Sequence, residues 1–188
     1  MIILASASPR RRELLTQIGC EFIFEPSETE EVKTGSPKKL VCENALLKAG
    51  QIAATHKDMW VIGADTVVAI GEEVYGKPAD EADAISMLRK LSGRSHQVYT
   101  GIALVYNDKY WQDFSVTEVE MAVLTEKEIE RYAASGESLD KAGSYAIQGK
   151  SAVFIKKIDG SYSNVVGLPL HKLYALCKKA GCNLIEEN

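Results

Sequence analysis

Two long strand-like segments that follow one another directly are the feature that most limits how this chain can fold. Gln97–Tyr106 and Trp111–Ala122 are rich in β-branched and aromatic side chains, and the polar turn Asn107–Lys109 separates them, a pattern typical of paired antiparallel strands. Elsewhere helix and strand patterns alternate, which alone would favour a parallel sheet. Because the long hairpin interrupts this alternation, we expect an α/β fold with a mixed β-sheet and flanking helices.

Capping residues and apolar spacing place the other elements. The sequence predicts strands at Ile2–Ala5, Trp60–Ile70 and Ala152–Ile155, helices that begin at Ser8-Pro9, Ser36-Pro37, Asp80 and Thr125, and a last helix that ends at Gly181. Thr125 and Glu128 have the spacing of a capping box. No repeat, linker or low-complexity segment divides the 188 residues, so residues 1–188 are expected to form a single domain.

Charge and composition argue against several classes of protein. The chain has 22 Lys and Arg against 26 Asp and Glu, a net charge of −4, which disfavours a main task of coating nucleic acid or an anionic membrane. No apolar run approaches the ~18 residues of a membrane span, and Ile2–Ala5 is too short for a signal peptide, so we expect a cytoplasmic protein. The four cysteines form no CxxC pair and the three histidines are scattered, which favours free core thiols over a zinc site.

A basic turn follows the first predicted strand. The segment Ser6-Ala7-Ser8-Pro9-Arg10-Arg11-Arg12 puts three arginines in the first turn of a helix, where unpaired N–H groups and the helix dipole favour anions. Each unpaired arginine would cost roughly 0.3–1 kcal/mol there, and a bound phosphate chain would reverse the sign of that cost. The turn therefore favours a polyphosphate site. The alternative is that the arginines face solvent or pair with Glu13 and the acidic stretch Glu25–Glu31.

Asp65 interrupts the second predicted strand, in Gly63-Ala64-Asp65-Thr66-Val67-Val68. A carboxylate on a hydrophobic strand is costly to bury unless it is hydrogen-bonded, near a cation or bound to metal, so Asp65 is a candidate base or metal ligand. The alternative is a strand-end residue that caps a nearby turn. A haloacid-dehalogenase phosphatase would have a second Asp where this chain has Val67, so an aspartyl-phosphate mechanism is disfavoured.

Separate polar residues further along the chain could complete such a site. Lys48 and Lys77 offer point charges suited to phosphate, although a lone lysine more often lies on the surface. Gln148 offers one acceptor and two donors, which match the N3–H and carbonyl groups of uracil or thymine and mismatch cytosine. A structural hydrogen bond is the simplest interpretation of His96, which has no second His or Cys near it.

Gly149-Lys150-Ser151 looks like the end of a Walker A loop. That loop needs a glycine five positions before the Gly of Gly-Lys, and position 144 is Ser, so the motif is rejected. The predicted strand at Ala152–Ile155, in place of a helix, argues the same way. Without a GxGxxG motif, a Rossmann dinucleotide site is also unsupported.

Six segments together resemble the Maf family of nucleoside triphosphate pyrophosphatases, in family order and over essentially the whole chain. They are Ala5–Leu15, Gly63–Val68, Gly76–Pro78, Leu88–Gly101, Asp140–Gly149 and Ile158–Pro169. The resemblance implies a fold similar to inosine-triphosphate pyrophosphatases, with two lobes around a cleft. It also implies hydrolysis of a nucleoside triphosphate to the monophosphate and pyrophosphate, helped by a divalent cation such as Mg²⁺. Family members are often dimers, so a second copy of the chain is a candidate partner.

The resemblance also assigns roles to individual residues. Asp65 takes the proton-acceptor position, and Arg10, Thr66 and Gln148 fall on specificity positions. Ser8, Arg11, Lys48 and Lys77 fall in phosphate-contacting segments, and Glu31 lies where the family has an acidic residue near the metal. Ala64-Asp65-Thr66 together with Ile147-Gln148-Gly149 resembles the branch that acts on dTTP and UTP, for removal of damaging nucleotides or control of pyrimidine pools. Ser138 departs from the family, which often has Pro there.

The hypothesis from the sequence is therefore in-line attack of water on the α-phosphorus. Asp65 would activate the water, directly or through bound metal, while Arg10, Arg11 and Lys77 stabilise the departing pyrophosphate. One alternative is a nucleotide-binding regulator of cell division or septum formation that acts through a protein partner. A second is an enzyme that hydrolyses inosine or xanthosine triphosphates, because Gln148 could also read a purine edge.

Overall fold

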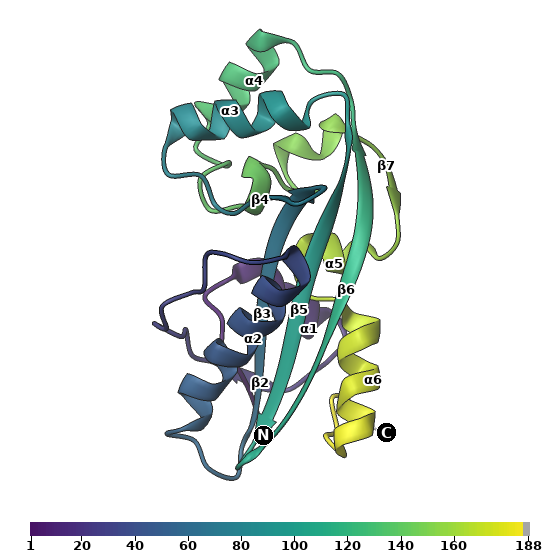
Figure 1. The fold of residues 1–188 in the computed structure, drawn as a ribbon. Coiled ribbons are helices and arrows are strands. Elements are labelled where there is room, and N and C mark those ends of the chain that lie inside the picture. Colours follow the sequence, from purple (N-terminus) through teal and green to yellow (C-terminus); the bar gives the residue numbers. More distant parts are fainter. Residues whose placement is uncertain (186–188) are drawn as a thin grey trace.

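A seven-stranded mixed sheet runs through the molecule in the order β2-β1-β3-β5-β6-β7, with β4 paired to β3 (Figure 1). The computed structural model describes residues 1–185. The strands are β1 (Ile2–Leu4), β2 (Phe22–Phe24), β3 (Trp60–Ile70), β4 (Glu73–Tyr75), β5 (Ser95–Tyr106), β6 (Lys109–Met121) and β7 (Ile155–Asp159). β1 is parallel to β2 and β3, whereas the other pairs are antiparallel. The expected mixed α/β architecture is confirmed.

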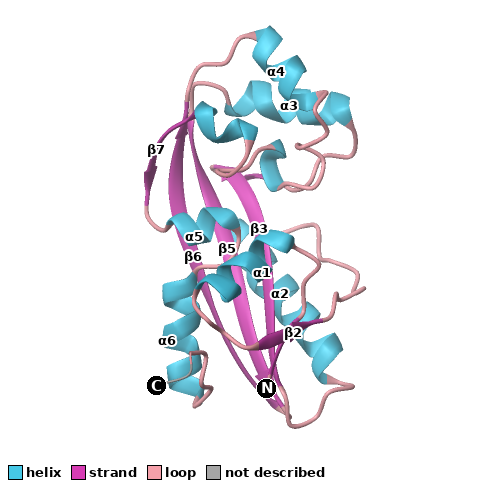
Figure 2. Cartoon of the chain, turned by 180° about the vertical axis from the view of Figure 1, so that it is seen from behind, coloured by secondary structure: helices cyan, strands magenta, loops and turns pink. Residues whose placement is uncertain are grey.

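The predicted long hairpin forms the longest pair of strands in this sheet. β5 and β6 stay in register from Tyr106 opposite Lys109 to Ser95 opposite Glu120. Asn107 turns the chain between them with φ of 53°, a left-handed conformation that Asn tolerates better than most residues. β3 lies along β5 over nine residue pairs. These three strands run along most of the length of the molecule, and α4 lies beyond their upper ends (Figure 2).

The helices gather at two ends of the sheet. They are α1 (Pro9–Gln17), α2 (Pro37–Ala53), α3 (Glu81–Leu91), α4 (Glu126–Ala133), α5 (Tyr162–Val166) and α6 (Leu170–Ala180). One end, here named the α3–α4 lobe, contains α3, α4, β4 and the 3₁₀ turns at Ala142–Ser144 and Lys150–Phe154 (Figure 1). The other, the α1–α2 lobe, contains α1, α2, α6, β1 and β2. The strands join the two lobes without a linker.

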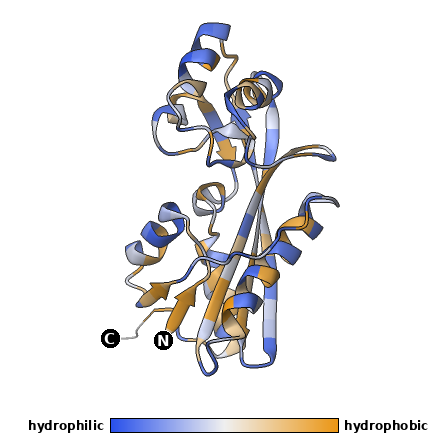
Figure 3. Ribbon diagram, turned by 90° about the vertical axis from the view of Figure 1, so that its left-hand side faces the viewer, coloured by the Kyte–Doolittle hydropathy of each residue, from blue (hydrophilic) through white to orange (hydrophobic). Residues whose placement is uncertain are grey.

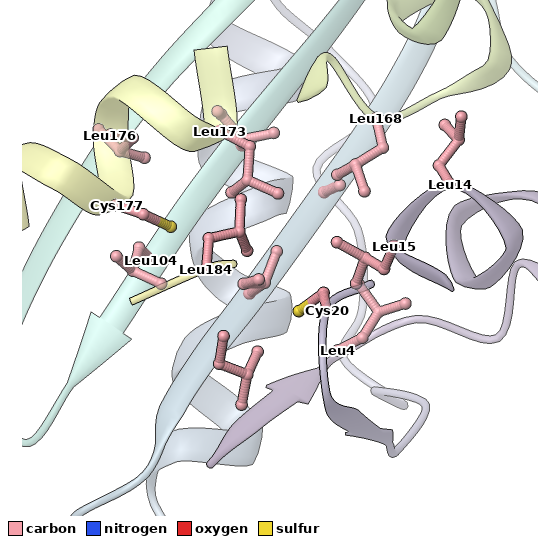
Figure 4. Close-up of a cluster of buried hydrophobic side chains, with 14 of the residues drawn as sticks. Leu4, Leu14, Leu15, Cys20, Leu104, Leu168, Leu173, Leu176, Cys177 and Leu184 are labelled. Atoms are coloured by element: carbon pink, nitrogen blue, oxygen red, sulfur yellow. The ribbon is translucent and has the colours of Figure 1, made fainter. Parts of the chain in front are cut away.

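Strand alternation divides the core of the α1–α2 lobe into two layers. On one face of the sheet, leucines of α1 and α6 pack with Cys20 and Cys177 against Leu4 and Leu104 (Figure 4). On the other face, small residues of α2 pack against Ile3 and Val61. The strands of this lobe are mostly hydrophobic, and its helices carry both hydrophobic and hydrophilic residues (Figure 3). This is expected for a sheet that is covered on both sides. A separate cluster fills the α3–α4 lobe.

Two glycines let α2 lie directly on the sheet. A Cβ atom at Gly63 of β3 would lie 2.1 Å from the carbonyl oxygen of Ala45, and one at Gly101 of β5 would lie 2.2 Å from that of Val41. Both distances are far below van der Waals contact with atoms of the α2 backbone, so only glycine fits at either position. This close approach brings the polar face of α2 against the middle of β3, beside Asp65.

Most predicted element boundaries are confirmed. β3 covers Trp60–Ile70, and α1, α2 and α3 begin directly after Ser8, Ser36 and Asp80. The Asp80 carboxylate accepts a hydrogen bond of 2.8 Å from the N–H of Asp83. Thr125 and Glu128 form the predicted capping box of α4.

The predicted strand at Ala152–Ile155 is wrong. Residues Lys150–Phe154 form a 3₁₀ turn, and the strand begins only at Ile155. The apolar run resembles a strand, but Gly149 at φ 77° turns the chain, and the Ser151 hydroxyl bonds back to Ala146. Tertiary contacts therefore override the local pattern here. The Walker A motif is still excluded by its glycine spacing.

Several short elements have no counterpart in the sequence prediction. β2 and β4 have three residues each and α5 has five, too few to show a periodicity. The four cysteines are free thiols, and three of them are buried as expected. Within residues 1–185, none of the helices has both the length and the apolar character that a bilayer span requires.

Candidate active site

A cavity of about 760 Å³ lies between the two lobes and is lined by both. The α1–α2 lobe contributes the β1–α1 loop, the segment before α2, one face of α2 and the middle of β3. The α3–α4 lobe contributes residues after β4 and the segment Asp140–Gln148. Every residue to which the family resemblance assigned a role lines this cavity: Ser8, Arg10, Arg11, Glu31, Lys48, Asp65, Thr66, Lys77 and Gln148. The fold thus brings together side chains that are up to 140 positions apart in sequence.

The start of α1 points donors at the cavity. Ser8 occupies the N-cap position, but its side chain makes no capping hydrogen bond, and the first turn holds no acidic residue. Ser6 Oγ instead accepts from the N–H of Ser8 at 3.2 Å. Free N–H groups at a helix N-terminus attract anions. The predicted anion-binding character of this turn is consistent with its geometry.

Arg11 is bonded to the protein on nearly all sides. Its Nε donates to the carbonyl of Gly167 at 2.7 Å, and its Nη1 donates to Ser6 Oγ and the carbonyl of Ala64 at 3.1 and 3.0 Å. Its Nη2 donates to Thr66 Oγ1 at 3.0 Å. Burial lowers the pKa of Arg11 from its ordinary value, yet a guanidinium stays charged. Arg11 therefore joins three segments of the cavity wall and adds a fixed positive charge to it.

The other two arginines of the basic turn have different surroundings. Arg10 lies 3.5 Å from Asp140 of the opposite lobe, so an ion pair spans the cavity. Arg12 is not among the lining residues, and its guanidinium stacks 4.2 Å above the ring of Phe24. Neither of the sequence alternatives, solvent exposure or pairing with the Glu25–Glu31 stretch, describes the three arginines. Two of them face the cavity and one packs on an aromatic ring.

Asp65 and Glu31 share one lysine. Lys48 Nζ lies 2.7 Å from Asp65 Oδ1 and 2.6 Å from Glu31 Oε1. The other oxygen of Asp65 accepts from the amide of Asn44 at 3.2 Å. Asp65 is 7% exposed, and it satisfies the requirement that a buried carboxylate be paired. Asn44 and Lys48 are one helical turn apart on α2, and the glycine contact described above places both against β3.

Glu31 is held in its charged form. Partial burial opposes ionisation of its carboxyl, but the hydrogen bond and charge of Lys48 outweigh that effect and lower the pKa of Glu31 below its ordinary value. More distant charges of Lys77 and Arg11 act in the same direction. The site therefore carries two neighbouring carboxylates that are separated by a single ammonium group.

Two hydroxyl groups are hydrogen-bonded to each other beside Asp65. Thr66 Oγ1 lies 3.0 Å from Thr100 Oγ1 of β5, and Thr100 donates to the carbonyl of Asn164 at 3.1 Å. Because Arg11 also binds Thr66, the Thr66 side chain is fixed from both sides. This ties the specificity position predicted at Thr66 to the basic turn.

Lys77 and Gln148 stand on the wall formed by the α3–α4 lobe. Lys77 is exposed and takes part in no ion pair within residues 1–185, so its ammonium group is available to a ligand. Gln148 is half-buried in the loop between the two 3₁₀ turns. The N–H donors of the β1–α1 loop, which suit a phosphate, and the amide of Gln148 thus belong to different parts of one cavity.

The cavity is positive although the chain is acidic. Six cationic side chains line it against three carboxylates; the cations are Arg10, Arg11, Lys33, Lys48, Lys77 and Lys141, and the carboxylates are Glu31, Asp65 and Asp140. The whole chain has a net charge of −4. A concave surface with one dominant sign concentrates ligands of the opposite charge. An excess of cationic side chains therefore lines this cavity, where it suits a negatively charged ligand.

The Glu31 and Asp65 carboxylates fit a weakly held divalent cation. Mg²⁺ binds through one or two carboxylates together with substrate phosphates and waters, and Glu31 and Asp65 offer two carboxylates that both contact Lys48. Among the described residues no cluster of three His, Cys, Asp or Glu side chains is suited to a metal. Glu31 and Asp65 are therefore the residues that could hold a cation together with phosphate oxygens.

His96 makes the structural hydrogen bond expected for it. Its Nε2 lies 2.5 Å from the hydroxyl of Tyr145, in the core of the α3–α4 lobe. Burial lowers the pKa of His96 to about 4, so the ring is neutral near pH 7. His96 is not among the residues that line the cavity.

Sequence reasoning missed several residues of the site. Asn44 was detectable, because it precedes Lys48 by four positions on the same helix face. Asp140 and Lys141 lie in a recognised segment but carried no separate signal. Lys33 lies in a stretch without secondary structure, where no periodicity indicates which side chains face inward.

Comparison with known proteins agrees with this geometry. A family model described as Maf-like protein matches residues 1–180. A protein of Agathobacter rectalis named dTTP/UTP pyrophosphatase is 48% identical over 202 aligned residues, which cover 97% of this chain and 98% of that protein. Proteins of the same name from Bacillus thuringiensis and Symbiobacterium thermophilum are 49% and 47% identical, and the alignments cover 92% and 96% of this chain and 91% and 94% of theirs.

A solved structure shares the fold at low sequence similarity. The Staphylococcus aureus Ham1 protein superposes with a TM-score of 0.52 and 16% identity, over 95% of this chain and 98% of that one. The likeness concerns the arrangement of the sheet and helices. With the family match over residues 1–180 and the cavity that unites its matched segments, the chain belongs to the Maf family.

Proposed function

We propose that this protein hydrolyses dTTP and UTP to the monophosphate and pyrophosphate. The observation that carries the proposal is the positive cavity in which the paired carboxylates of Asp65 and Glu31 lie with the open N-terminus of α1. The relatives at 47–49% identity bear the name of that activity. Reaction at the α–β anhydride bond needs a positive cradle for the leaving pyrophosphate and a group that activates water.

The basic wall would bind the triphosphate. The N–H groups of α1 and the Ser8 hydroxyl supply directional donors, while Arg10 and Lys77 supply charges from the two lobes. Arg11 acts differently, because protein groups already occupy most of its N–H donors. Its contribution is a preorganised positive charge that stabilises the negative charge gathering on pyrophosphate in the transition state.

Asp65 would orient and deprotonate the attacking water. Its carboxylate lies in the cavity wall, and Lys48 and Asn44 hold its two oxygens in a fixed direction. A positioned carboxylate of this kind contributes to catalysis as a general base. The proton taken from water would reside on Asp65, and the electrons of the broken P–O bond pass to the pyrophosphate oxygen.

A divalent cation completes the proposed reaction. Glu31 and Asp65 would hold it, together with phosphate oxygens and water. When bound, a cation such as Mg²⁺ neutralises phosphate charge and polarises the reacting anhydride. The protein residues around it keep their own roles, since Lys48 still balances the charge of the two carboxylates.

Gln148 would select the base. Its amide can donate to a carbonyl oxygen and accept from the N3–H of uracil or thymine, whereas cytosine presents an acceptor at N3. The same side chain could pair with a purine edge, so a substrate panel separates this proposal from hydrolysis of inosine or xanthosine triphosphate.

The test is a panel of triphosphates with Mg²⁺, in which monophosphate and pyrophosphate are both quantified. The expected result is equimolar UMP and pyrophosphate from UTP and the equivalent from dTTP, with slower turnover of CTP, ITP and XTP. Formation of nucleoside diphosphate and orthophosphate would contradict attack at the α-phosphorus. Because the relatives are named as enzymes, the alternative of a non-enzymatic regulator of cell division or septum formation is not favoured, and a panel without any hydrolysis would restore it.

A further inference from the structure

The loop that carries Gln148 has no regular structure of its own. It spans Tyr145–Gly149, between the 3₁₀ turns at Ala142–Ser144 and Lys150–Phe154. Tyr145, Ala146, Ile147 and Gln148 of this loop line the cavity. A loop has no helix or sheet ladder to fix its backbone, so a side chain on it is only as well placed as the contacts that anchor the loop.

The first anchor precedes Gln148 by three residues. Tyr145 is 4% exposed, and its hydroxyl lies 2.5 Å from Nε2 of His96, which is 2% exposed. The two rings meet edge to face, with centroids 5.2 Å apart and an interplanar angle of 80°. His96 belongs to β5, so this hydrogen bond ties the loop to a strand of the central sheet. A buried pair of polar groups of this kind is costly to separate.

The second anchor follows Gln148 by three residues. Ser151 is fully buried, and its Oγ accepts from the N–H of Ala146 at 2.9 Å and donates to the carbonyl of Ala146 at 2.8 Å. The same oxygen lies 3.0 Å from the hydroxyl of Tyr132 on α4. One hydroxyl therefore closes the loop on itself and ties it to the neighbouring helix. The two anchors use different elements. Tyr145 itself lines the cavity, but the hydrogen bonds of both anchors involve none of Ser8, Arg10 and Lys77.

We propose that Tyr145 and Ser151 are positioning residues that set base selectivity by fixing the loop of Gln148. The inference rests on the proposed function and adds to it the residues that make the amide of Gln148 selective. A matched base gains from both hydrogen bonds of a well-placed amide, whereas a mismatched base gains little. Loosening the loop therefore weakens the binding of the matched substrate more than that of the mismatched one, and the selectivity between them falls.

Tyr145→Phe and Ser151→Ala test the two anchors separately. Each removes one hydroxyl and keeps the surrounding shape. In each variant kcat/KM for UTP should fall roughly fivefold, the factor that corresponds to one hydrogen bond of average strength, mainly through KM. The value of kcat/KM for CTP should change much less, so the ratio of kcat/KM for UTP to that for CTP falls. Inhibition of UMP formation by added pyrophosphate should change much less than kcat/KM for UTP, because the hydrogen bonds of the anchors do not involve Ser8, Arg10 or Lys77.

Tyr99→Phe is the matched control. Tyr99 lies on β5, three residues from His96, and its hydroxyl donates to Gln97 at 2.7 Å. Strand alternation puts it on the face opposite His96, and it does not line the cavity. The same substitution there should leave the UTP-to-CTP ratio unchanged.

The outcomes separate this inference from the proposed function. An active wild type that prefers UTP, with both variants keeping its UTP-to-CTP ratio, would overturn the positioning role alone. An equal loss for both substrates would also overturn it, because it indicates a merely structural effect. A wild type that forms no UMP from UTP would overturn the proposed function, and the inference with it.

Discussion

Lys48 Nζ lies 2.7 Å from one oxygen of Asp65 and contacts Glu31 at the same time. The proposed base is thus fixed by α2 on one face of the sheet, while the basic turn begins α1, which packs on the opposite face. This arrangement puts the proposed base and the groups proposed to receive the leaving pyrophosphate on different elements.

Asp65→Asn should reduce kcat for UTP by at least about 100-fold, because a positioned general base contributes roughly 10²–10⁴-fold. The amide keeps the size of the side chain, so the fold and nucleotide binding should persist. Single-turnover UMP formation measures the first effect, and calorimetric binding of UTP measures the second. Near-normal turnover by this variant would assign the base to another residue.

Lys48→Met should destabilise the fold as well as slow the reaction. It leaves two carboxylates beside each other without their shared cation, and the loss of a hydrogen bond to a charged group costs about 1.5–3 kcal/mol. Urea unfolding measures that loss. Lys156→Met is the control, since Lys156 pairs with Glu120 on the surface and exposed ion pairs contribute only about 0–1 kcal/mol. Equal losses in the two variants would contradict a special role for Lys48.

Gln148→Glu should remove most of the base preference. A carboxylate only accepts hydrogen bonds, so it keeps the contact with the N3–H of uracil but repels its carbonyl, while cytosine gains a contact through its exocyclic amine and is repelled at N3. A bidentate contact to a base edge is worth about 1–3 kcal/mol, hence kcat/KM for UTP should fall by roughly 5- to 150-fold. Steady-state rates with UTP and CTP check this. Gln112→Glu, the same change at an exposed position of β6, should alter neither rate; an unchanged ratio in Gln148→Glu would remove Gln148 from base recognition.

His96 should make the protein less stable in mild acid. Its pKa is lowered to about 4 by burial, against about 6.5 in an unfolded chain. Between these values the unfolded chain takes up a proton that the folded protein does not, so the free energy of unfolding falls as pH falls. The difference between pH 7.5 and pH 5 is about 2 kcal/mol from this group.

Urea unfolding at those two pH values measures the effect. His96→Gln cannot titrate and should show a correspondingly smaller decrease, even if it is less stable at both pH values. His171→Gln controls for the loss of an exposed histidine. Parallel pH profiles of wild type and His96→Gln would show that His96 is not the sensitive group.

Gly101→Ala should damage the site from a distance. The new methyl group would meet the carbonyl of Val41 at 2.2 Å, so α2 must move away from the sheet and take Asn44 and Lys48 with it. Overpacking costs typically about 1–3 kcal/mol, and kcat should fall as well. Gly50 lies in α2, and a Cβ atom there would meet nothing within 4 Å. Gly50→Ala should therefore stabilise the fold by about 0.5–1 kcal/mol. Thermal unfolding and UTP turnover of both variants distinguish the two positions.

Local signals in the sequence predicted most of the fold. The starts of α3 and α4 were predictable from Asp80 and Thr125. A helix cap is a contact between residues three positions apart, so both partners are visible in the local sequence. β3 was recognisable because its apolar run is long. The segment after Gly149 was mispredicted because its conformation depends on the bond between Ser151 and Ala146 and on Tyr132, which belongs to a separate helix.

The site was predictable as a set of residues but not as a set of contacts. Charge anomalies indicated Arg10, Arg11 and Asp65, and the family resemblance added the others. The sequence contains nothing that separates Arg12 from its two neighbours, since its contact with Phe24 exists only when β2 has joined the sheet. The occupied donors of Arg11 likewise depend on carbonyl groups of β3 and of Gly167.

The unbroken ladder of β3, β5 and β6 has a mechanical consequence. Enzymes whose domains are joined by a flexible loop can open widely and accept ligands of many lengths. Here both lobes are attached to the same strands, so the separation of the two cavity walls changes mainly as far as a twisted sheet can bend. The length of a ligand that contacts both walls is therefore limited by the sheet, and a molecule that is too short to reach both of them loses the contacts of one wall.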